Sequence, residues 1–558
     1  MEETTTSSIR LSAPSSRTKR SSGLKRAFLL LTLVGAIAGR DASSCAAAVP
    51  ADIQAVFNQA RYSGATWGLR VVDVKSGTAT IDLRSNVKFL IGSVRKVFSV
   101  GELLDEVGPN HTYDTPIYRR GTMDGSGVLK GDLILVASGD LTMGGRTNPD
   151  GSIAFSNYDH NEADSLGNAV LTAPDPLKGY KAIAAQVAAA RITRITGEVI
   201  IDDRLFQPYR FRDEFDVRPI FVNDDVVDLS INPTTPGSPA SVASRPISAA
   251  LSIQSSLMTT APGTELTLKL QPAPPADLEC IGKPGCIGQI VGNLPSDYKP
   301  PLTNAFPLVQ TFRITQPSNY ARTVLIEALR AAGLTVDSAP IEQNPAQLLP
   351  PKNFYSSSTQ VAKLTGMPYS SDAKLVLKVS YNIGADTSLL LWGLTKGADN
   401  MTDALAAEQK NLDVHYGVKP TEYSFVDGSG GGETSATPIA ITQFLRDRTT
   451  RPTFQTFFDS LPILAVDGSL GFVTNFKSDS ALAGATGNVH AKTGTFVHGG
   501  PAGLMLKSQA LAGYVKAKSG KLLVFEIVVN NVKITALNDV LQAFQDEGTI
   551  AAILWRDN

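Results

Sequence analysis

Two short stretches near the amino end alternate apolar and polar residues in the way that β-strands do. The first runs from Thr66 to Val74 and the second from Thr78 to Leu83, with Lys75-Ser76-Gly77 between them. A period of two with many β-branched residues is typical of strands, and a short segment with Ser and Gly is typical of a turn. The pattern therefore predicts a β-hairpin.

A helical pattern follows the hairpin. After the apolar segment Phe89–Ile91, the residues Val97, Val100, Leu103 and Leu104 recur at a spacing that places them on one face of a helix. Gly92 stands between Ile91 and Ser93, at a position where a helix can begin. We therefore expect a helix whose first turn contains Ser93.

The carboxy end predicts further strands. Residues 487–495, 510–515 and 522–529 are extended and apolar in pattern, and Lys518-Ser519-Gly520 forms a turn between the last two. The middle of the chain, from about 109 to 355, is rich in strands with Gly and Pro turns and is interrupted only by a predicted helix over 319–332. An α+β fold with an antiparallel sheet is expected.

Composition narrows the functional class. The 558 residues contain 51 Lys and Arg against 52 Asp and Glu, so the net charge of −1 offers no electrostatic footprint for nucleic acid. Hydrophobic residues make up 42%, with 47 Gly and 33 Pro, which indicates a globular protein rich in loops. The length is sufficient for two or three domains.

The amino end resembles a secretory leader. Basic residues between Arg17 and Arg26 precede an apolar run, 27–38, and small residues at 46–48 suit cleavage. We expect residues 1–48 to be a signal peptide and the mature chain to lie outside the cytoplasm, in the periplasm or cell envelope. The apolar run is too short to span a bilayer, and we expect no transmembrane span in the mature chain.

Cleavage there would remove Cys45 and leave Cys280 and Cys286. In an oxidising compartment, two cysteines six residues apart in a Pro/Gly loop favour a disulfide. Two cysteines and five scattered histidines do not make a four-ligand metal site, so we expect no metal and no cofactor.

The pattern Ser-x-x-Lys occurs six times, and position on a helix selects among the six. A serine becomes a good nucleophile when a neighbouring base takes its proton, and a lysine one helical turn away can do so if it is kept neutral. Only Ser93, with Lys96, begins the predicted helix, where backbone N–H groups could also stabilise an oxyanion. The nearest rival, Ser371, lies only nine residues before Ser380.

Two further motifs complete the candidate site. Ser380-Tyr381-Asn382 precedes the helical run 388–392, where Ser380 could relay a proton to a leaving amine and Asn382 could hold a substrate amide. They would form one wall of a cleft.

The opposite wall would be the strand that contains Lys492-Thr493-Gly494-Thr495. Lys492 offers a fixed positive charge and Thr493 a hydroxyl for a substrate carboxylate, while Gly494 allows close approach. The N–H of Thr495 would be the second oxyanion donor beside that of Ser93.

These motifs and their order resemble the low-molecular-mass class C penicillin-binding proteins, the D-alanyl-D-alanine carboxypeptidase/endopeptidase family. Other segments resemble family landmarks in the same order: Gly131-Asp132-Leu133, residues 138–142, 317–321, 426–430, 467–470 and 513–515. Ser380 follows Ser93 by 287 positions, which leaves room for an insertion that simple β-lactamases lack, and Lys492 follows Ser380 by 112 positions.

The resemblance implies hydrolysis of peptidoglycan stem peptides and cross-bridges through an acyl-enzyme, with β-lactams as inhibitors. It also implies a catalytic domain of residues 49–108 and 356–558, and a β-rich insertion of residues 109–355 built from two nested domains. The alternatives are a serine β-lactamase or D-aminopeptidase/esterase of the same fold, and a non-catalytic scaffold that binds the cell wall.

Other polar segments have simpler interpretations. Residues 427–430 repeat the pattern of 124–127, Asp-Gly-Ser-Gly, and both are expected to be turns. The resemblance favours a cleft-lining role only for 427–430. Asp224 and Asp225 are expected in a solvated loop. The segment 496–510 differs from the family's usual connection after the third motif, and we expect it to reshape the leaving-group side of the cleft.

Overall fold

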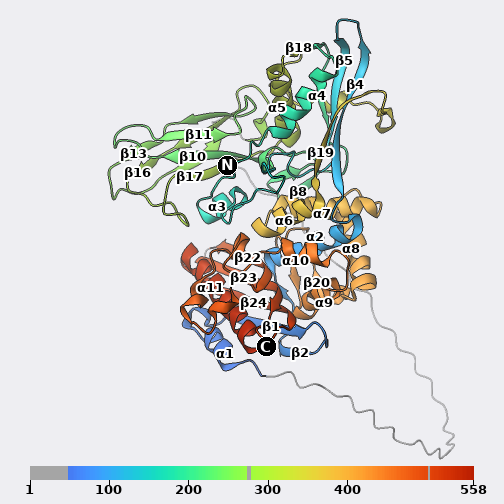
Figure 1. Cartoon of the computed structure of the whole chain (residues 1–558). Coiled ribbons are helices and arrows are strands. Elements are labelled where there is room, and N and C mark those ends of the chain that lie inside the picture. The colour runs from blue at the N-terminus through green and yellow to red at the C-terminus, as the bar shows by residue number, and fades with distance from the viewer. Residues whose placement is uncertain (1–47, 273–277, 501–502) are drawn as a thin grey trace, which may run out of the picture. The chain divides into compact units, whose positions relative to one another are not determined.

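The computed structural model describes residues 48–272, 278–500 and 503–558 (Figure 1). Residues 46–558 form one compact unit. Residues 1–47 of the predicted signal peptide lie outside the described part. Among the described residues, the structure contains no helix of the length and apolar character needed to cross a membrane.

The first and last strands of the chain share one antiparallel sheet, in the order β2-β1-β24-β23-β22. Its strands are β1 (Thr66–Asp73), β2 (Ala79–Leu83), β22 (Val489–Gly500), β23 (Gly503–Lys516) and β24 (Leu522–Ile534). Strand β1 pairs with β24 along its whole length, from Thr66 opposite Asn530 to Asp73 opposite Leu523. The predicted hairpin is confirmed, and β23 and β24 are longer than the sequence pattern indicated.

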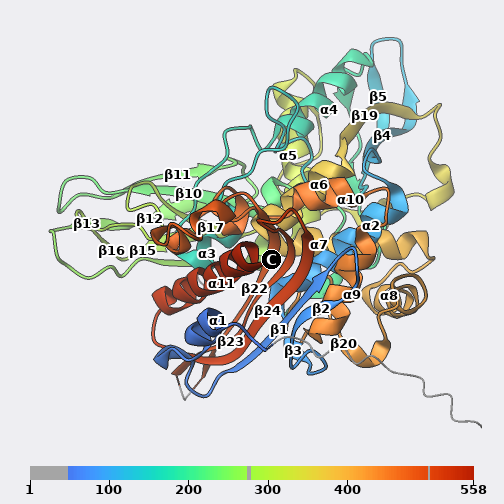
Figure 2. The same cartoon turned by 60° about the horizontal axis from the view of Figure 1, so that its bottom comes forward.

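Helices cover both faces of this sheet (Figure 2). Because alternate residues of a strand point to opposite faces, Phe525, Ile527 and Val529 of β24 join the core beneath α11, whereas Val524 and Val528 join the larger helical core. The first face carries α1 (Ala51–Phe57) and α11 (Leu537–Asp557). The second face carries α2 (Lys96–Val107), α6 (Tyr369–Val379), α7 (Asn382–Thr395), α8 (Met401–Tyr416), α9 (Pro438–Arg448) and α10 (Phe454–Ser460).

A small sheet of three strands belongs to the same part of the molecule. Its order is β20-β21-β3, with β3 (Phe89–Leu90), β20 (Tyr423–Ser424) and β21 (Ser435–Ala436). Strand β3 leads directly into the turn that contains Ser93, so this sheet anchors the start of α2.

A second large sheet lies between the first two motifs in sequence. Its order is β18-β6-β5-β4-β19, with β7 paired to β5. The strands are β4 (Thr112–Met123), β5 (Val128–Val136), β6 (Arg194–Ile195), β7 (Val199–Asp202), β18 (Thr335–Val336) and β19 (Gln360–Pro368). The predicted insertion limits of 109 and 355 stay a prediction.

This region contains more helix than the sequence indicated. The predicted helix is present as α5 (Pro317–Ala331), but the expectation that it is the only one is wrong, because α4 (Lys178–Ala189) and the short α3 (Ala163–Leu166) are also present. Helix α4 buries Tyr180, Ile183 and Val187. Its remaining buried positions are Gly and Ala, which give weak hydrophobic contrast along the sequence.

The rest of the inserted region is built from short strands. They form the sheets β11-β10-β17 and β12-β15-β14 and the pairs β13-β16 and β8-β9. The bounds are β8 (Tyr209–Phe211), β9 (Phe215–Val217), β10 (Val226–Asn232), β11 (Ser241–Arg245), β12 (Ser252–Ser255), β13 (Met258–Thr260), β14 (Lys269–Pro272), β15 (Ile287–Val291), β16 (Asn293–Pro295) and β17 (Leu308–Arg313). The predicted disulfide between Cys280 and Cys286 is present just before β15.

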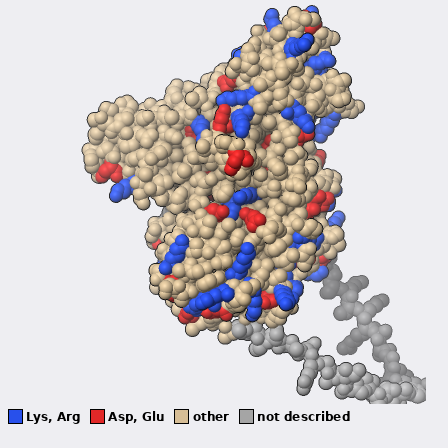
Figure 3. All heavy atoms as spheres, viewed as in Figure 1, with Lys and Arg blue, Asp and Glu red and all other residues tan. Residues whose placement is uncertain are grey.

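The surface carries both signs of charge. On the face seen in Figure 3, Lys and Arg side chains are interspersed with Asp and Glu among uncharged atoms. This distribution agrees with the net charge of −1.

Candidate active site

Ser93 and Lys96 lie together at the beginning of α2. Ser93 belongs to a single 3-10 turn, Gly92–Arg95, which continues into the α-helix at Lys96. The Nζ atom of Lys96 lies 2.5 Å from the Oγ atom of Ser93. The helical spacing of the first motif therefore places the candidate base directly beside the candidate nucleophile.

Lys96 is completely buried and lies among polar atoms from three segments. Its Nζ atom is 2.7 Å from Asn382 Oδ1, 3.2 Å from Ser380 Oγ and 3.1 Å from the carbonyl oxygen of Ser429. Burial, partly offset by the charge of Glu162, lowers the pKa of Lys96 to about 7. A large share of Lys96 is therefore unprotonated near neutral pH and able to accept a proton.

The second motif lies at the junction of α6 and α7. Ser380 ends α6 in the left-handed conformation, with φ 62° and ψ 34°, and Asn382 is the first residue of α7. Such a conformation is unfavourable for a residue with a side chain and is often found at active sites. In this conformation Ser380 Oγ contacts both lysines, since it lies 3.2 Å from Lys96 Nζ and 2.9 Å from Lys492 Nζ.

The third motif lies on β22, opposite Ser380. The Thr493 hydroxyl is 2.8 Å from the Ser469 hydroxyl, and Lys492 Nζ is 2.8 Å from the Thr493 carbonyl oxygen. Lys492 is fully buried. Burial, and after it the charge of Lys96, hold the pKa of Lys492 well below its ordinary value. Burial therefore weakens the positive charge that the sequence predicts at Lys492.

Glycine allows β22 to approach the turn of Ser93. A Cβ atom on Gly494 would lie 2.0 Å from the carbonyl oxygen of Ile91, and one on Gly92, whose φ is +47°, would lie 2.9 Å from the amide nitrogen of Thr495. No other residue fits at these contacts. The Thr495 amide is thereby held next to the turn that carries the Ser93 amide.

The Asp-Gly-Ser-Gly segment at 427 is a turn, as predicted, and it also borders the site. The Asp427 carboxylate accepts hydrogen bonds from the backbone N–H groups of Ser429 at 3.0 Å and Gly430 at 2.6 Å. This arrangement directs the Ser429 carbonyl to Lys96. The matching segment at Asp124 connects β4 to β5, where Asp124 accepts from Ser126.

All three motifs border one cavity of about 590 Å³. The predicted residues that line it are Ser93, Ser380, Asn382, Thr493 and Thr495. The Nζ atoms of Lys96 and Lys492 contact Ser93 and Ser380, respectively. Gly494 packs against the backbone of Ile91, next to the turn of Ser93.

Sequence reasoning missed five residues that line the cavity from the inserted region. They are Asn157, Asp159, Glu162, Leu166 and Arg212. Asn157 is fixed by its Oδ1 atom, which accepts a hydrogen bond of 2.8 Å from the Gly468 N–H. No local pattern marks these residues, because they reach the cavity only through long-range packing.

Asp224 and Asp225 are buried, so their predicted place in a solvated loop is wrong. Their exposed fractions are 2% and 1%. Asp224 pairs with Arg146, whose guanidinium also donates to both Asp159 oxygens at 2.7 Å. The sequence pattern Asn-Asp-Asp is typical of a loop, and its actual partner stands 78 residues earlier in the chain.

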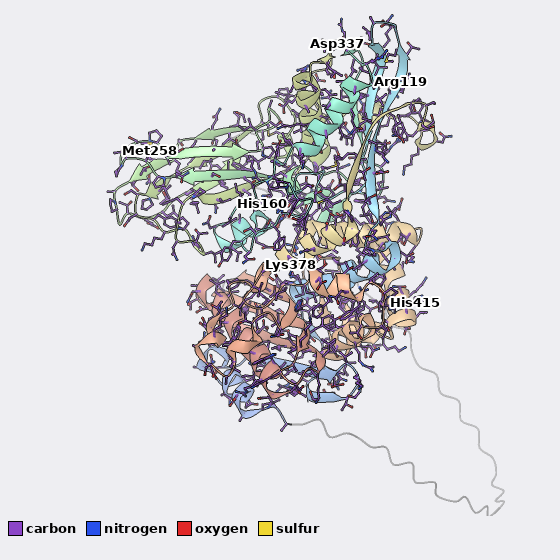
Figure 4. The ribbon with its side chains drawn as sticks, viewed as in Figure 1. Arg119, His160, Met258, Asp337, Lys378 and His415 are labelled. Carbon is purple, nitrogen blue, oxygen red and sulfur yellow. A yellow bond between two sulfur atoms is a disulfide. The ribbon has the colours of Figure 1, made fainter. Side chains whose placement is uncertain are left out.

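His160, labelled in Figure 4, belongs to the same buried network. Its Nδ1 atom is 2.7 Å from Asp228 Oδ1. Burial alone would lower the pKa of His160, but Asp228 and other partners raise it to about 9. Although ligand atoms of Asp159, His160 and Asp224 lie within 4.8 Å of one another, the guanidinium of Arg146 contacts all three and supplies positive charge there.

Comparison with known proteins agrees with this geometry. Residues 49–547 match the model of the D-Ala-D-Ala carboxypeptidase 3 (S13) family. A D-alanyl-D-alanine carboxypeptidase from Actinomadura sp. (strain R39) is 24% identical over 505 residues, which span 86% of this chain and 80% of that protein.

Solved structures confirm the predicted α+β fold. Penicillin-binding protein 4 (DacB) from Haemophilus influenzae is similar with a TM-score of 0.66 at 16% identity, over 90% of this chain and 99% of that one. The same protein in complex with a β-lactam has a TM-score of 0.63 at 17% identity, over the same shares. The chain therefore belongs to the D-Ala-D-Ala carboxypeptidase 3 (S13) family and is a serine-type D-Ala-D-Ala carboxypeptidase.

Proposed function

We propose that Ser93 is the nucleophile and Lys96 the base of this carboxypeptidase. The observation that carries the proposal is the distance of 2.5 Å between Lys96 Nζ and Ser93 Oγ, combined with a Lys96 pKa of about 7. Lys96 accepts the Ser93 proton while Oγ attacks the carbonyl carbon of the D-Ala-D-Ala bond. The N–H groups of Ser93 and Thr495 stabilise the oxyanion that forms.

Ser380 carries the proton to the leaving amine. Its hydroxyl lies between Lys96 Nζ, at 3.2 Å, and Lys492 Nζ, at 2.9 Å, so it can receive a proton from one side and donate it to the departing nitrogen. Asn382 orients the substrate amide. Water then attacks the ester on Ser93 and releases the shortened peptide, with Lys96 as the base.

Lys492 and Thr493 bind the terminal carboxylate of the substrate. An anion beside Lys492 favours its protonated form, which burial disfavours in the empty site. Thr493, with Ser469 at 2.8 Å, supplies hydroxyl donors to the same carboxylate. Binding of substrate thereby favours the positive charge on Lys492.

The same machinery supports cleavage of cross-bridges and acylation by β-lactams. A D,D-endopeptidase substrate differs only in the group beyond the scissile bond, and a β-lactam presents a strained amide to the same serine. The Haemophilus influenzae relative in complex with a β-lactam supports the second extension.

Peptidoglycan stem peptides are the proposed partners, and the proposed location is outside the cytoplasm, in the periplasm or cell envelope. Two observations support this location: the leader-like amino end and the disulfide between Cys280 and Cys286, a bond that is typical of oxidising compartments.

Labelling with a fluorescent penicillin tests the assignment. We expect the mature protein to gain one stable adduct by intact mass, the Ser93→Ala variant to gain none, and the Ser371→Ala variant to label like the wild type. Ser371 is a matched control because it begins the rival Ser-x-x-Lys segment. Absence of an adduct on folded wild type would favour the scaffold, and rapid release of hydrolysed penicillin would favour a β-lactamase.

A further inference from the structure

The cavity that contains Ser93 has a second, apolar end. Six of its lining residues form what we call the apolar lobe: Val497 of β22, Leu504 of β23, Ile534 of β24, and Val540, Leu541 and Phe544 of α11. Val497 and Leu504 expose 40% and 43% of their surface, although both are large and hydrophobic. Ile534 and Val540 are buried, so Val497 and Leu504 are the exposed members of the lobe. Apolar side chains that line the continuation of a catalytic cleft are typical of a binding site.

A chain of hydrogen bonds fixes the position of α11 along the length of the catalytic strand β22. Thr495 Oγ1 donates to Gln509 Oε1 at 2.9 Å, and Gln509 Nε2 donates to Glu547 Oε2 at 3.0 Å. Glu547 is therefore level with Thr495.

The lobe lies beyond that level, toward the end of β22. Helix α11 begins after β24 ends at Ile534, and Ile534 pairs with Leu504, which pairs with Gly499. Phe544 and Val540 precede Glu547 by three and seven residues, or about 5 and 10 Å of helix. Both therefore lie beside the part of β22 that follows Thr495.

The direction of the proposed reaction assigns this end to the acyl group. With the terminal carboxylate at Lys492 and Thr493 and the scissile carbonyl at Thr495, the acyl portion continues past Phe496 toward Val497. With this direction Phe496, Val497 and Leu504 border the acyl side of the cleft, whereas the sequence of the segment 496–510 indicated the leaving-group side.

The charged lining residues lie elsewhere in the cavity. Among the described lining residues these are Asp159, Glu162 and Arg212, all from the inserted region. Asn157 bonds to the Gly468 N–H and so places its segment beside the Ser469 end. A charged group against the six apolar side chains would lose part of its hydration and gain no charged partner among them, whereas an apolar group would gain from burial.

We propose that the apolar lobe binds an uncharged, apolar acyl substituent, aromatic or branched aliphatic, of the molecule that acylates Ser93. The inference deepens the proposed function and rests on it.

Two penicillins that differ only in the acyl substituent test the lobe. The first, benzylpenicillin, carries a benzyl group, and the second carries a methyl group in its place. We expect wild type to react about tenfold faster with the benzyl compound, since burial of a ring in an apolar site is worth at least that factor. The measured quantity is the ratio of the two second-order acylation rate constants.

The double variant Val497→Ser/Leu504→Ser is expected to bring this ratio close to one. Both residues are partly exposed, which favours folding, and a ratio taken within one protein cancels any loss of active fraction. Val414→Ser is the matched control, because Val414 lies on α8, is 74% exposed and does not line the cavity. We expect the control to keep the wild-type ratio.

Three results would overturn the inference. The wild-type ratio could be near one, it could be the same in the double variant, or a benzyl compound with an added α-carboxylate could react as fast as benzylpenicillin. The last result would place the acyl group at the charged end. If neither penicillin acylated wild type, the proposed function itself would fail, which distinguishes the two failures.

Discussion

Lys96 has two opposing requirements that burial reconciles. It must lie within hydrogen-bonding distance of Ser93, and it must be unprotonated when the substrate arrives. Because burial lowers the Lys96 pKa to about 7, the unprotonated fraction increases as pH rises through 7. We expect the acylation rate constant for a β-lactam to rise from pH 5 to 9 with a midpoint near 7. A profile that is flat over this range would contradict the role of Lys96.

Substitution of Lys96 separates charge from proton transfer. Arginine retains a positive charge but cannot lose it at accessible pH. We expect Lys96→Arg to lower the acylation rate constant by about 100-fold or more, the usual effect of losing a general base. Stopped-flow labelling measures the rate, and circular dichroism shows whether the variant is folded. A folded variant with wild-type acylation would exclude Lys96 as the base.

At the level of elements, side chains tie β22 and β23 to α11 behind the oxyanion donor. Gln509 is fully buried and joins Thr495 to Glu547. Burial raises the pKa of Glu547 well above its ordinary value and so favours its neutral form. The chain of hydrogen bonds holds the strand next to the point where its register shifts, between Phe496 and Val497.

This arrangement makes opposite predictions for two variants. Glu547→Gln preserves a neutral acceptor and is expected to acylate at the wild-type rate. Gln509→Leu removes both hydrogen bonds, frees Thr495, and is expected to slow acylation about tenfold, the order of effect of a displaced oxyanion donor. Measurement of the acylation rate constant and of noncovalent affinity separates positioning from binding. Equal rates in the two variants would show that the chain has no role in positioning.

At the scale of the whole molecule, the inserted region and the catalytic part share one cavity. The network of Arg146, Asp159 and Asp224 holds in place the segment that supplies Asn157 and Asp159 to that cavity. Burial alone would raise the pKa of Asp224, but Arg146 and His160 hold it below its ordinary value. Its contribution to stability is present above about pH 4 and is lost as the pH falls further.

Replacing Asp224 removes one of the two buried carboxylates that pair with Arg146 and leaves only Asp159. We expect Asp224→Asn to lower the free energy of unfolding by about 3 kcal/mol, as for other buried pairs from which one partner is removed. The matched control is Asp213→Asn, at the exposed turn between β8 and β9, which should change it by less than about 0.5 kcal/mol. Denaturant titration at pH 7 measures both, and similar values would refute the importance of the network.

Local patterns in the sequence were sufficient to predict the secondary structure around the catalytic motifs. The hairpin of β1 and β2, the start of α2 at Ser93 and Lys96, and the carboxy-terminal strands depend on residues within one turn or one strand of each other. Periodicity records such neighbours directly. Helix α4 was not predicted from the sequence, because its small buried residues give little hydrophobic contrast along it.

Only the tertiary structure decided what those motifs do together. The Lys96 pKa near 7, the contact of both lysines with Ser380, and the burial of Asp224 depend on residues 78 to 286 positions apart. Burial and desolvation are properties of the packed molecule, and no local pattern encodes them. The sequence therefore determined which groups carry the chemistry, and the fold determined their charge, their partners and the shape of the cavity between them.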